Sequence, residues 1–280
     1  MKKLYLLSFV FFFAACYHKT VPQQRSQTSL IADGKLWSSA FMQVSAEYNA
    51  LCHQAYNIAK QRVDETLNTA YNQPLAIVTD IDETFLNNSY YAVQRALQNK
   101  DYDTRSWYEW TGKSDATPLP GSLNFFNYAA QKGITIFYLT NRDEVEREGT
   151  LNNLKKFSYP FADNEHLIMR TTTSSKETRR AAIADHYTIF LLIGDNLADF
   201  STLWDKKNIA ERAKNVENSR EEFGKKFIIL PNPNYGGWED AIYGNSHSLT
   251  PTQKDSAIKS VLKPFWQFKG YKNSVGANVI

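Results

Sequence analysis

The chain has 280 residues, of which 42% are hydrophobic and 22% are charged. That composition is ordinary for a globular protein, and the length is ample for one large domain or two modest ones. Two of the +3 formal charges are Lys2 and Lys3, so the chain without its first 15 residues carries only +1. Positive and negative charges are therefore nearly balanced, which excludes a protein that binds nucleic-acid polymers through bulk electrostatics.

Residues 1–15 are predicted to be a secretory signal peptide. Two lysines precede an apolar run that is too short to span a bilayer as a stable helix. Two alanines and Cys16 then resemble the lipobox of bacterial lipoproteins, although Phe13 stands where leucine is usual. We therefore expect Cys16 to be lipidated, with an ordinary cleaved signal peptide as the alternative. The following segment, 16–34, is rich in Gln, Ser and Thr and is predicted to be a flexible tether.

The segment 35–72 is predicted to be helical. From Trp37 to Leu67, apolar residues recur at helical spacing, which indicates one long amphipathic helix or two helices broken near the middle. Cys52 lies among these positions and is interpreted as a packing residue. Lipidation of Cys16 would leave Cys52 alone, so no disulfide is expected within the chain.

The apolar run from Leu75 to Val78 is predicted to be a buried strand, and two aspartates follow it. Asp80 and Asp82 stand one residue apart, with Thr84 two residues further on. In an open α/β sheet, ligands bind at the carboxyl ends of the strands. Two carboxylates in a confined site repel each other, so one suits a nucleophile or metal ligand and the other a proton carrier. An acidic, helix-capping turn is the alternative interpretation.

This strand and turn lie in a predicted catalytic core, 73–240, which has an aromatic and aperiodic insert at 87–118. Strands and helices alternate after the insert, which predicts an α/β fold with a doubly wound parallel sheet. The predicted helices are 122–132, 143–157, 176–186 and most of 201–223, and the predicted strands are 134–140, 166–169, 188–193 and 227–230. The C-terminal segment, 241–280, is predicted to form a helix and an aromatic tail that pack on the segment 35–72, giving a smaller, mainly helical domain.

Three predicted strands end in turns that carry polar and charged side chains: Asp80 to Asp82, Thr140 to Arg142, and Asp195 with Asp199. We expect these turns to meet at one edge of the sheet. Asp80 and Asp195 can share a hard divalent cation there, and Mg²⁺ is the natural choice for oxygen ligands. Thr140 and its neighbouring backbone N–H can donate to phosphoryl oxygens. Lys176 can neutralise phosphate charge, and Asp199 can hold that lysine. These are the parts needed for phosphoryl transfer through an aspartyl-phosphate.

Each of these residues also has an ordinary structural interpretation. Thr140 could cap a strand end, Lys176 could be a solvated helix residue, and Asp195 and Asp199 could be turn and capping residues. Their combination, in this order and at these strand ends, favours the functional interpretation.

At this point the chain resembles a known family. The motif order is similar to that of the haloacid dehalogenase (HAD) superfamily of four-aspartate phosphohydrolases. The fuller strings resemble the class C acid phosphatases, which are bacterial outer-membrane lipoproteins that act as 5′-nucleotidases. Those strings are Asp80-Ile-Asp-Glu-Thr84, Asn87-Asn-Ser89, Tyr138-Leu-Thr-Asn-Arg142, Gly194-Asp-Asn-Leu-Ala-Asp-Phe200 and Leu230-Pro-Asn-Pro-Asn-Tyr-Gly-Gly-Trp238.

The resemblance implies a role for each residue of the motifs. Asp80 would be the nucleophile and a metal ligand, and Asp82 the general acid and base that also binds Mg²⁺ through its main-chain carbonyl. Asp195 would complete the protein ligands and Asp199 would support the site. The phosphate would bind to Thr140, Asn141 and Lys176, and the nucleotide base would be clamped by Trp107 and Tyr235, with Tyr91 nearby.

The sequence therefore predicts a lipid-anchored, Mg²⁺-dependent acid phosphatase of the bacterial outer membrane. Its expected substrates are nucleoside 5′-monophosphates and other small phosphomonoesters, and a homodimer is a further expectation. Alternatives are a non-catalytic surface or storage protein on the same fold, a general phosphatase without nucleotide preference, and a relative that cleaves phosphonates or carbon–halogen bonds. A thiol-based phosphatase is disfavoured because Ile58 stands where the Cys-x5-Arg signature would place arginine.

Overall fold

The computed structural model describes residues 29–264, and within them a parallel five-stranded sheet forms the centre of the molecule. The strand order is β5-β4-β1-β6-β7. The bounds are β1 (Leu75–Thr79), β4 (Thr135–Leu139), β5 (Leu167–Ile168), β6 (Thr188–Gly194) and β7 (Phe227–Ile229). From β1 the chain adds β4 and β5 on one side, then returns to add β6 and β7 on the other. The carboxyl end of β1 is therefore the switch point, where ligands bind in such sheets.

Helices cover both faces of this sheet, because alternate strand residues point to opposite sides. One face packs on α2 (Ala46–Thr66), α5 (Ser122–Gln131) and α6 (Arg147–Lys156), and its core includes Ile77, Tyr138 and Ile193. The other face packs on α7 (Glu177–Ala184) and on the segment leading to α8 (Ile209–Asn218), and its core includes Val78, Leu192 and Trp204. The predicted doubly wound α/β fold is confirmed.

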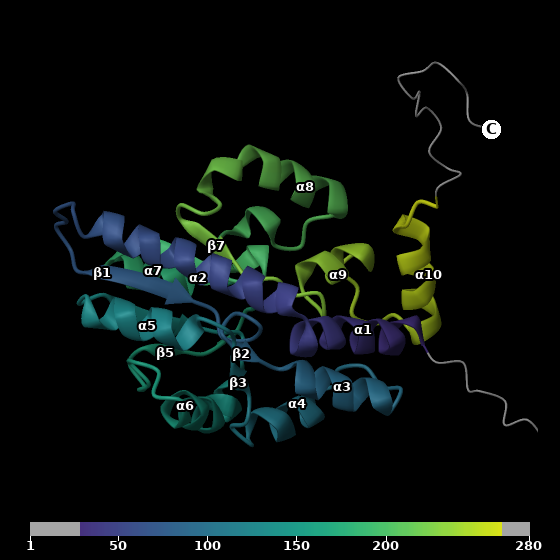
Figure 1. Cartoon of the computed structure of the whole chain (residues 1–280). Helices are drawn as coiled ribbons and strands as arrows, with labels where there is room; N and C mark the ends of the chain where they lie inside the picture. Colours follow the sequence, from purple (N-terminus) through teal and green to yellow (C-terminus); the bar gives the residue numbers. More distant parts are fainter. Residues whose placement is uncertain (1–28, 265–280) are drawn as a thin grey trace, which may run out of the picture.

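The helical part of the molecule lies at the end of the sheet where the insert leaves β1. Its first helix, α1 (Leu30–Val44), packs along α3 (Ser89–Leu97) and contacts α10 (Pro251–Val261) (Figure 1). The Leu30 backbone N–H donates to Asp255 at 3.2 Å, and Lys254 pairs with Asp101 at 2.5 Å. The other elements here are β2 (Leu86–Asn87), α4 (Thr104–Thr111), β3 (Thr117–Pro118) and α9 (Gly237–Ile242).

The long apolar pattern predicted after Trp37 forms two helices, and Ser45 explains the break. Ser45 adopts an extended conformation with ψ of 135°, and its hydroxyl accepts a hydrogen bond from the Tyr48 backbone N–H. A serine in that position satisfies an unpaired N–H in the first turn of a new helix. The same hydroxyl donates to the Phe41 carbonyl at the end of α1.

Two predicted boundaries differ from the structure. Helix α1 begins at Leu30, within the segment 16–34 predicted as a tether, because Ser29 caps it. The single helix predicted over most of 201–223 is wrong. That segment forms two short 3₁₀ helices, η3 (Thr202–Trp204) and η4 (Arg220–Glu222), on either side of α8, because Asn208 starts a new helix with a capping box.

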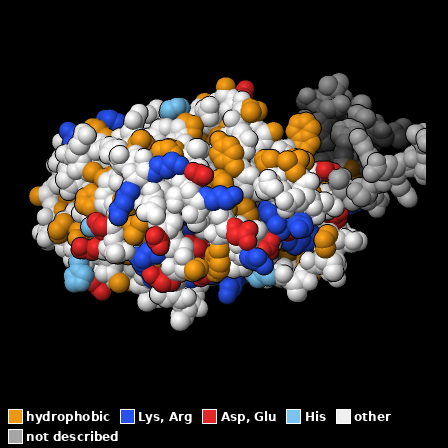
Figure 2. All heavy atoms as spheres, turned by 90° about the horizontal axis from the view of Figure 1, so that it is seen from below, with side chains coloured by type: hydrophobic (Ala, Val, Ile, Leu, Met, Phe, Trp, Pro, Cys, Tyr) orange, Lys and Arg blue, Asp and Glu red, His pale blue; other side chains and the backbone are white. Residues whose placement is uncertain are grey.

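Two further 3₁₀ helices, η1 (Glu144–Glu146) and η2 (Leu197–Asp199), follow β4 and β6. The predicted signal peptide, Cys16, most of the predicted tether and the aromatic tail lie outside the described residues. Across residues 29–264, no helix is both long enough and apolar enough to cross a membrane. On the face seen in Figure 2, acidic and basic side chains are interspersed, so that face carries no continuous basic patch for a polyanion.

Candidate active site

The ends of three neighbouring strands bring the predicted site residues to one edge of the sheet. Asp80 follows β1, Thr140 follows β4 and Asp195 follows β6. The Asp80 backbone N–H donates to the Ile193 carbonyl at 2.9 Å, which continues the sheet to the site. A cavity of about 550 Å³ opens at this edge and is lined by Asp80, Asp195 and Lys176, together with three aromatic residues of the insert, Tyr91, Tyr102 and Trp107. A second cavity of about 630 Å³, mainly apolar, lies between α2, α8 and β7 and shares Asp195 with the first.

Lys176 forms the electrostatic centre of this edge. Its side chain is almost fully buried, and its ammonium donates both to Asp80 Oδ1 and, at 2.7 Å, to Asp199 Oδ1. The other Asp199 oxygen accepts from the Asn196 backbone N–H at 3.0 Å, in the capping box of η2. Both oxygens of Asp199 therefore accept hydrogen bonds. Lys176 lies between the carboxylates of Asp80 and Asp199, and its contact with Asp199 agrees with the sequence-based prediction.

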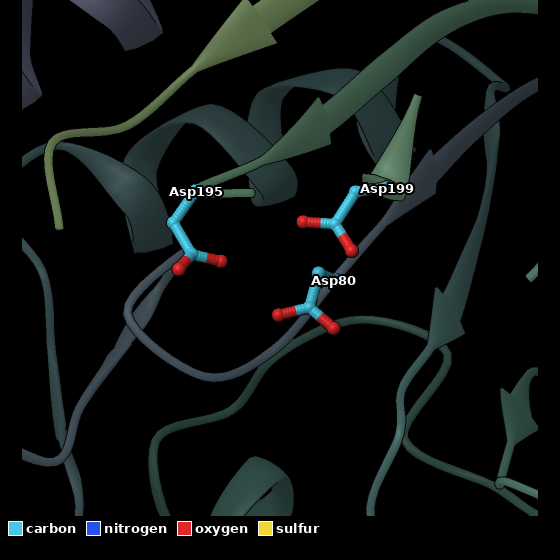
Figure 3. Close-up of side chains that lie close together, drawn as sticks. All are labelled: Asp80, Asp195 and Asp199. Carbon is cyan, nitrogen blue, oxygen red and sulfur yellow. The ribbon is translucent and has the colours of Figure 1, made fainter. Parts of the chain in front are cut away.

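Three carboxylates point toward one another at the centre of the site (Figure 3). One oxygen from each of Asp80, Asp195 and Asp199 lies within 4.8 Å of the others. The Thr84 hydroxyl lies 3.2 Å from Asp195 Oδ1, and Asn232 donates to Asp195 Oδ2 at 2.7 Å.

Burial and crowding raise the pKa values of these carboxyl groups. Burial raises the pKa of Asp80 to about 7, opposed by the charge of Lys176 and reinforced by Asp199 and Asp82. Burial and the charges of Asp199 and Asp80 also raise the pKa of Asp195 well above its usual range. A single lysine does not balance three carboxylates, and an oxygen-only donor set suits a hard divalent cation. The residues present therefore fit a site for a hard divalent cation.

Asp82 lines the same cavity but has different hydrogen-bond partners from this cluster. Arg142 donates to both Asp82 oxygens, through Nε at 3.1 Å each and through Nη2 to Oδ1 at 2.6 Å. Asn88 adds a bond to Oδ1 at 2.9 Å. The two aspartates of the motif therefore have separate surroundings, one facing a lysine and the cation site, the other facing an arginine.

The predicted phosphate-binding residues lie in the turn after β4, and Arg179 holds this turn. The Thr140 hydroxyl accepts from the Arg142 backbone N–H at 3.1 Å, so its own hydrogen remains available to a ligand. Arg179 donates to the Thr140 carbonyl at 2.6 Å and to Asn141 Oδ1 at 2.7 Å. Sequence reasoning missed Arg179, because an arginine one turn into a polar helix resembles any solvated helix residue.

The three aromatic residues predicted to hold the base all line the 550 Å³ cavity. Trp107 packs edge-to-face on Tyr91, with ring centroids 5.1 Å apart. The Tyr235 hydroxyl donates to Glu83, a fully buried residue with a left-handed φ of 54°. Burial and the charge of Asp82 raise the pKa of Glu83 to about 8. Sequence reasoning missed this role, although Glu83 stands inside the motif between Asp82 and Thr84.

The fold and the carboxylate–lysine cluster together define a protein of the HAD superfamily. The family model described as HAD superfamily, subfamily IIIB (Acid phosphatase) matches residues 18–238. The chain therefore belongs to this acid phosphatase family.

Solved structures and curated proteins agree with that membership. The crystal structure of a class C acid phosphatase from Bacillus anthracis with tungstate bound matches with a TM-score of 0.81 and 36% identity, over 84% of this chain and 98% of that one. Acid phosphatase 1 of Solanum lycopersicum is 28% identical over 130 residues, which are 44% of this chain and 50% of that protein. A stem 31 kDa glycoprotein of Glycine max is 29% identical over 125 residues, 42% of this chain and 49% of that protein. The chain thus spans about half the length of these curated relatives, and together these findings support a phosphoric monoester hydrolase.

Proposed function

We propose that the protein is a lipid-anchored, Mg²⁺-dependent acid phosphatase that prefers nucleoside 5′-monophosphates and works through an aspartyl-phosphate. One observation carries this proposal: Asp80, Lys176, Asp195 and Asp199 converge on a cavity that Tyr91, Trp107 and Tyr235 also line. The match to the Bacillus anthracis structure with tungstate bound adds support, because tungstate is an oxyanion similar to phosphate.

In the first step, an Asp80 oxygen attacks phosphorus as the bond to the leaving oxygen breaks. Asp82 gives its proton to that oxygen, and the alcohol departs. The Thr140 hydroxyl, the Asn141 amide and the Lys176 ammonium bind the phosphoryl oxygens. Positioning and charge stabilisation of this kind supply most of the catalysis in phosphoryl transfer.

In the second step, Asp82 acts as the base. Its carboxylate takes a proton from water as the water oxygen attacks phosphorus, and the bond to Asp80 breaks. The products are inorganic phosphate, the free Asp80 carboxylate and a reprotonated Asp82. Separate surroundings for the two aspartates suit this division of roles, because Asp80 faces Lys176 and the carboxylate cluster while Asp82 faces Arg142.

The metal is proposed to bind Asp80, the main-chain carbonyl of Asp82 and Asp195, supported by Asp199. When bound, Mg²⁺ would neutralise charge on the phosphoryl oxygens. The chain's own contribution is to fix the ligands: Thr84 and Asn232 orient the Asp195 carboxylate.

The nucleotide preference rests on Trp107, Tyr235 and Tyr91, which line the cavity. Stacking on aromatic rings is worth about 1–3 kcal/mol per base and tolerates every base, since each has a π face. Glu83 accepts a hydrogen bond from the Tyr235 hydroxyl, and Tyr91 packs edge-to-face on Trp107. The rings of Tyr235 and Trp107 are therefore held in place.

The test compares Trp107→Ala on a nucleoside monophosphate and on phenyl phosphate. A base clamp predicts that kcat/KM falls about 10- to 100-fold for the nucleotide and far less for the small ester. Trp37→Ala is the matched control, because Trp37 is 80% exposed on α1. Equal losses for both substrates, with a lowered melting temperature, would assign Trp107 to packing and leave a general phosphatase.

The cellular setting is also a proposal. Lipidation of Cys16 would attach the enzyme to the bacterial outer membrane, since the several acyl chains of a bacterial lipoprotein bind membranes firmly. A homodimer is proposed as well, and size measurement in detergent would test it.

A further inference from the structure

The two oxygens of the Asp82 carboxyl group have unequal surroundings. Oδ1 accepts from Arg142 Nη2 at 2.6 Å, from Asn88 Nδ2 at 2.9 Å and from Arg142 Nε at 3.1 Å. Oδ2 shares only the Nε hydrogen, at 3.1 Å. Because Oδ1 is surrounded by N–H donors, a hydrogen on Oδ1 would face other hydrogens. The proton of a neutral Asp82 must therefore be on Oδ2.

Contacts with residues other than Asp82 fix the position of the Arg142 guanidinium. It is 2% exposed, and its Nη1 donates to the Thr150 hydroxyl on α6 at 3.0 Å. The guanidinium also lies 5.9 Å from the centre of the Trp107 ring. A planar guanidinium fixed at two sides presents its remaining N–H groups to a carboxylate in one orientation.

Asn88 is oriented by a second residue of the insert. The Trp110 indole N–H donates to Asn88 Oδ1 at 2.8 Å. An indole nitrogen can only donate, so the oxygen of the Asn88 amide must face Trp110 and its NH₂ group must face Asp82. The direction of the Asn88 bond to Asp82 follows from this contact.

We propose that Arg142 and Asn88 are positioning residues that hold the Asp82 carboxyl group so that Oδ2 carries the transferred proton. This inference rests on the proposed role of Asp82 as the general acid. In the first step the Oδ2–H bond breaks as phosphorus leaves the substrate oxygen, which receives that proton and departs as an alcohol. In the second step Oδ2 takes a proton back from water.

The alternative role for Arg142 is direct binding of the substrate phosphate, since it also lines the cavity. The two roles differ in their dependence on the leaving group. A general acid matters most when the leaving oxygen is strongly basic, as in an alkyl ester, and little when it is weakly basic, as in p-nitrophenyl phosphate. Loss of a phosphate contact would lower kcat/KM equally for both esters.

The experiment measures kcat/KM for an alkyl phosphate and for p-nitrophenyl phosphate in Mg²⁺, with Asp82→Asn as the benchmark. Lysine cannot make the bidentate contact with a carboxylate. We therefore expect Arg142→Lys to lower kcat/KM about 10- to 100-fold on the alkyl ester and much less on the aryl ester. Because Arg142 is buried, Thr150→Val and Trp110→Phe are measured as well. Each removes one supporting hydrogen bond, and each should lose about 3- to 10-fold on the alkyl ester.

Arg147→Lys is the matched control. Arg147 also pairs with a carboxylate, Glu144, and a backbone carbonyl, but it does not line the cavity. It should leave both substrates unchanged. If Asp82→Asn is selective for the alkyl ester and the three test variants lose equally on both esters or not at all, the positioning role is overturned while the acid stands. If Asp82→Asn is itself unselective, the proposed role of Asp82 fails, and the inference fails with it.

Discussion

Replacement of Lys176 by methionine is the sharpest test of how the site is held together. The lysine ammonium contacts Asp80 and Asp199, and all three side chains are at least nine-tenths buried. Methionine has a similar volume but no charge, so Lys176→Met leaves two carboxylates together without a cation. Removal of one partner from a buried ion pair costs about 3–5 kcal/mol, since the remaining charge is neither solvated nor paired.

The cost should depend on pH, and its sign follows from Asp80. The folded-state pKa of Asp80 is raised from 3.8 to about 7, so the folded chain binds this proton more tightly than the unfolded chain. Stability therefore falls as pH rises through that window. The charge of Lys176 lowers the pKa of Asp80, so loss of this lysine raises that pKa further. The pH range over which stability falls then extends to higher pH. We expect a smaller penalty at pH 5, where the Asp80 carboxyl group is protonated, and a larger penalty at pH 8, where it is ionised in the wild type.

Urea unfolding in EDTA at pH 5 and pH 8, followed by tryptophan fluorescence, measures this difference. Lys60→Met is the matched control, because Lys60 also pairs with an aspartate, Asp64, but both side chains are exposed. Its unfolding midpoint should barely change at either pH. An equal penalty for Lys176→Met at both pH values would refute the idea that unpaired buried carboxylates cause it.

Three further predictions concern catalysis, the metal and the anchor. Asp80→Asn should lower turnover by about 10⁴-fold or more while the chain stays folded, because Asp199 still pairs with Lys176 and the crowding of carboxylates is relieved; a variant that keeps a tenth of wild-type turnover would contradict its role as nucleophile. Dialysis against EDTA should abolish activity and Mg²⁺ should restore it, so full activity in the metal-free enzyme would contradict the cation site. Cys16→Ser should release active enzyme from membranes, whereas a wild-type protein that already fractionates as soluble would favour an ordinary signal peptide.

The strand ends of the site could be predicted from the sequence because each combines an apolar run with polar or charged residues directly after it. The apolar runs before Asp80 and Asp195 mark buried strands, and parallel strands bring their carboxyl ends to one edge. Boundaries set by single capping residues were harder to predict. Ser29 starts α1 inside the predicted tether, and Asn208 starts α8 where one longer helix was expected.

The partners of the site residues could not be predicted, because they depend on contacts between distant segments. Arg142 stands 60 residues after Asp82, and only the pairing of β4 with β1 brings the two together. Glu83 looks like an exposed turn residue in the sequence, yet the loop after β7 buries it beneath Tyr235. Side-chain orientation of this kind is decided by tertiary packing rather than by local sequence.

The central claim is that Asp80 becomes covalently phosphorylated. The most direct test quenches the enzyme during turnover of a phosphomonoester, reduces it with borohydride and sequences the peptide that contains residue 80 by mass spectrometry. An acyl phosphate is reduced to an alcohol, so the account predicts homoserine in place of aspartate at position 80, and none in Asp80→Asn. An unmodified Asp80 in the turning-over enzyme, with homoserine at another aspartate, would contradict it.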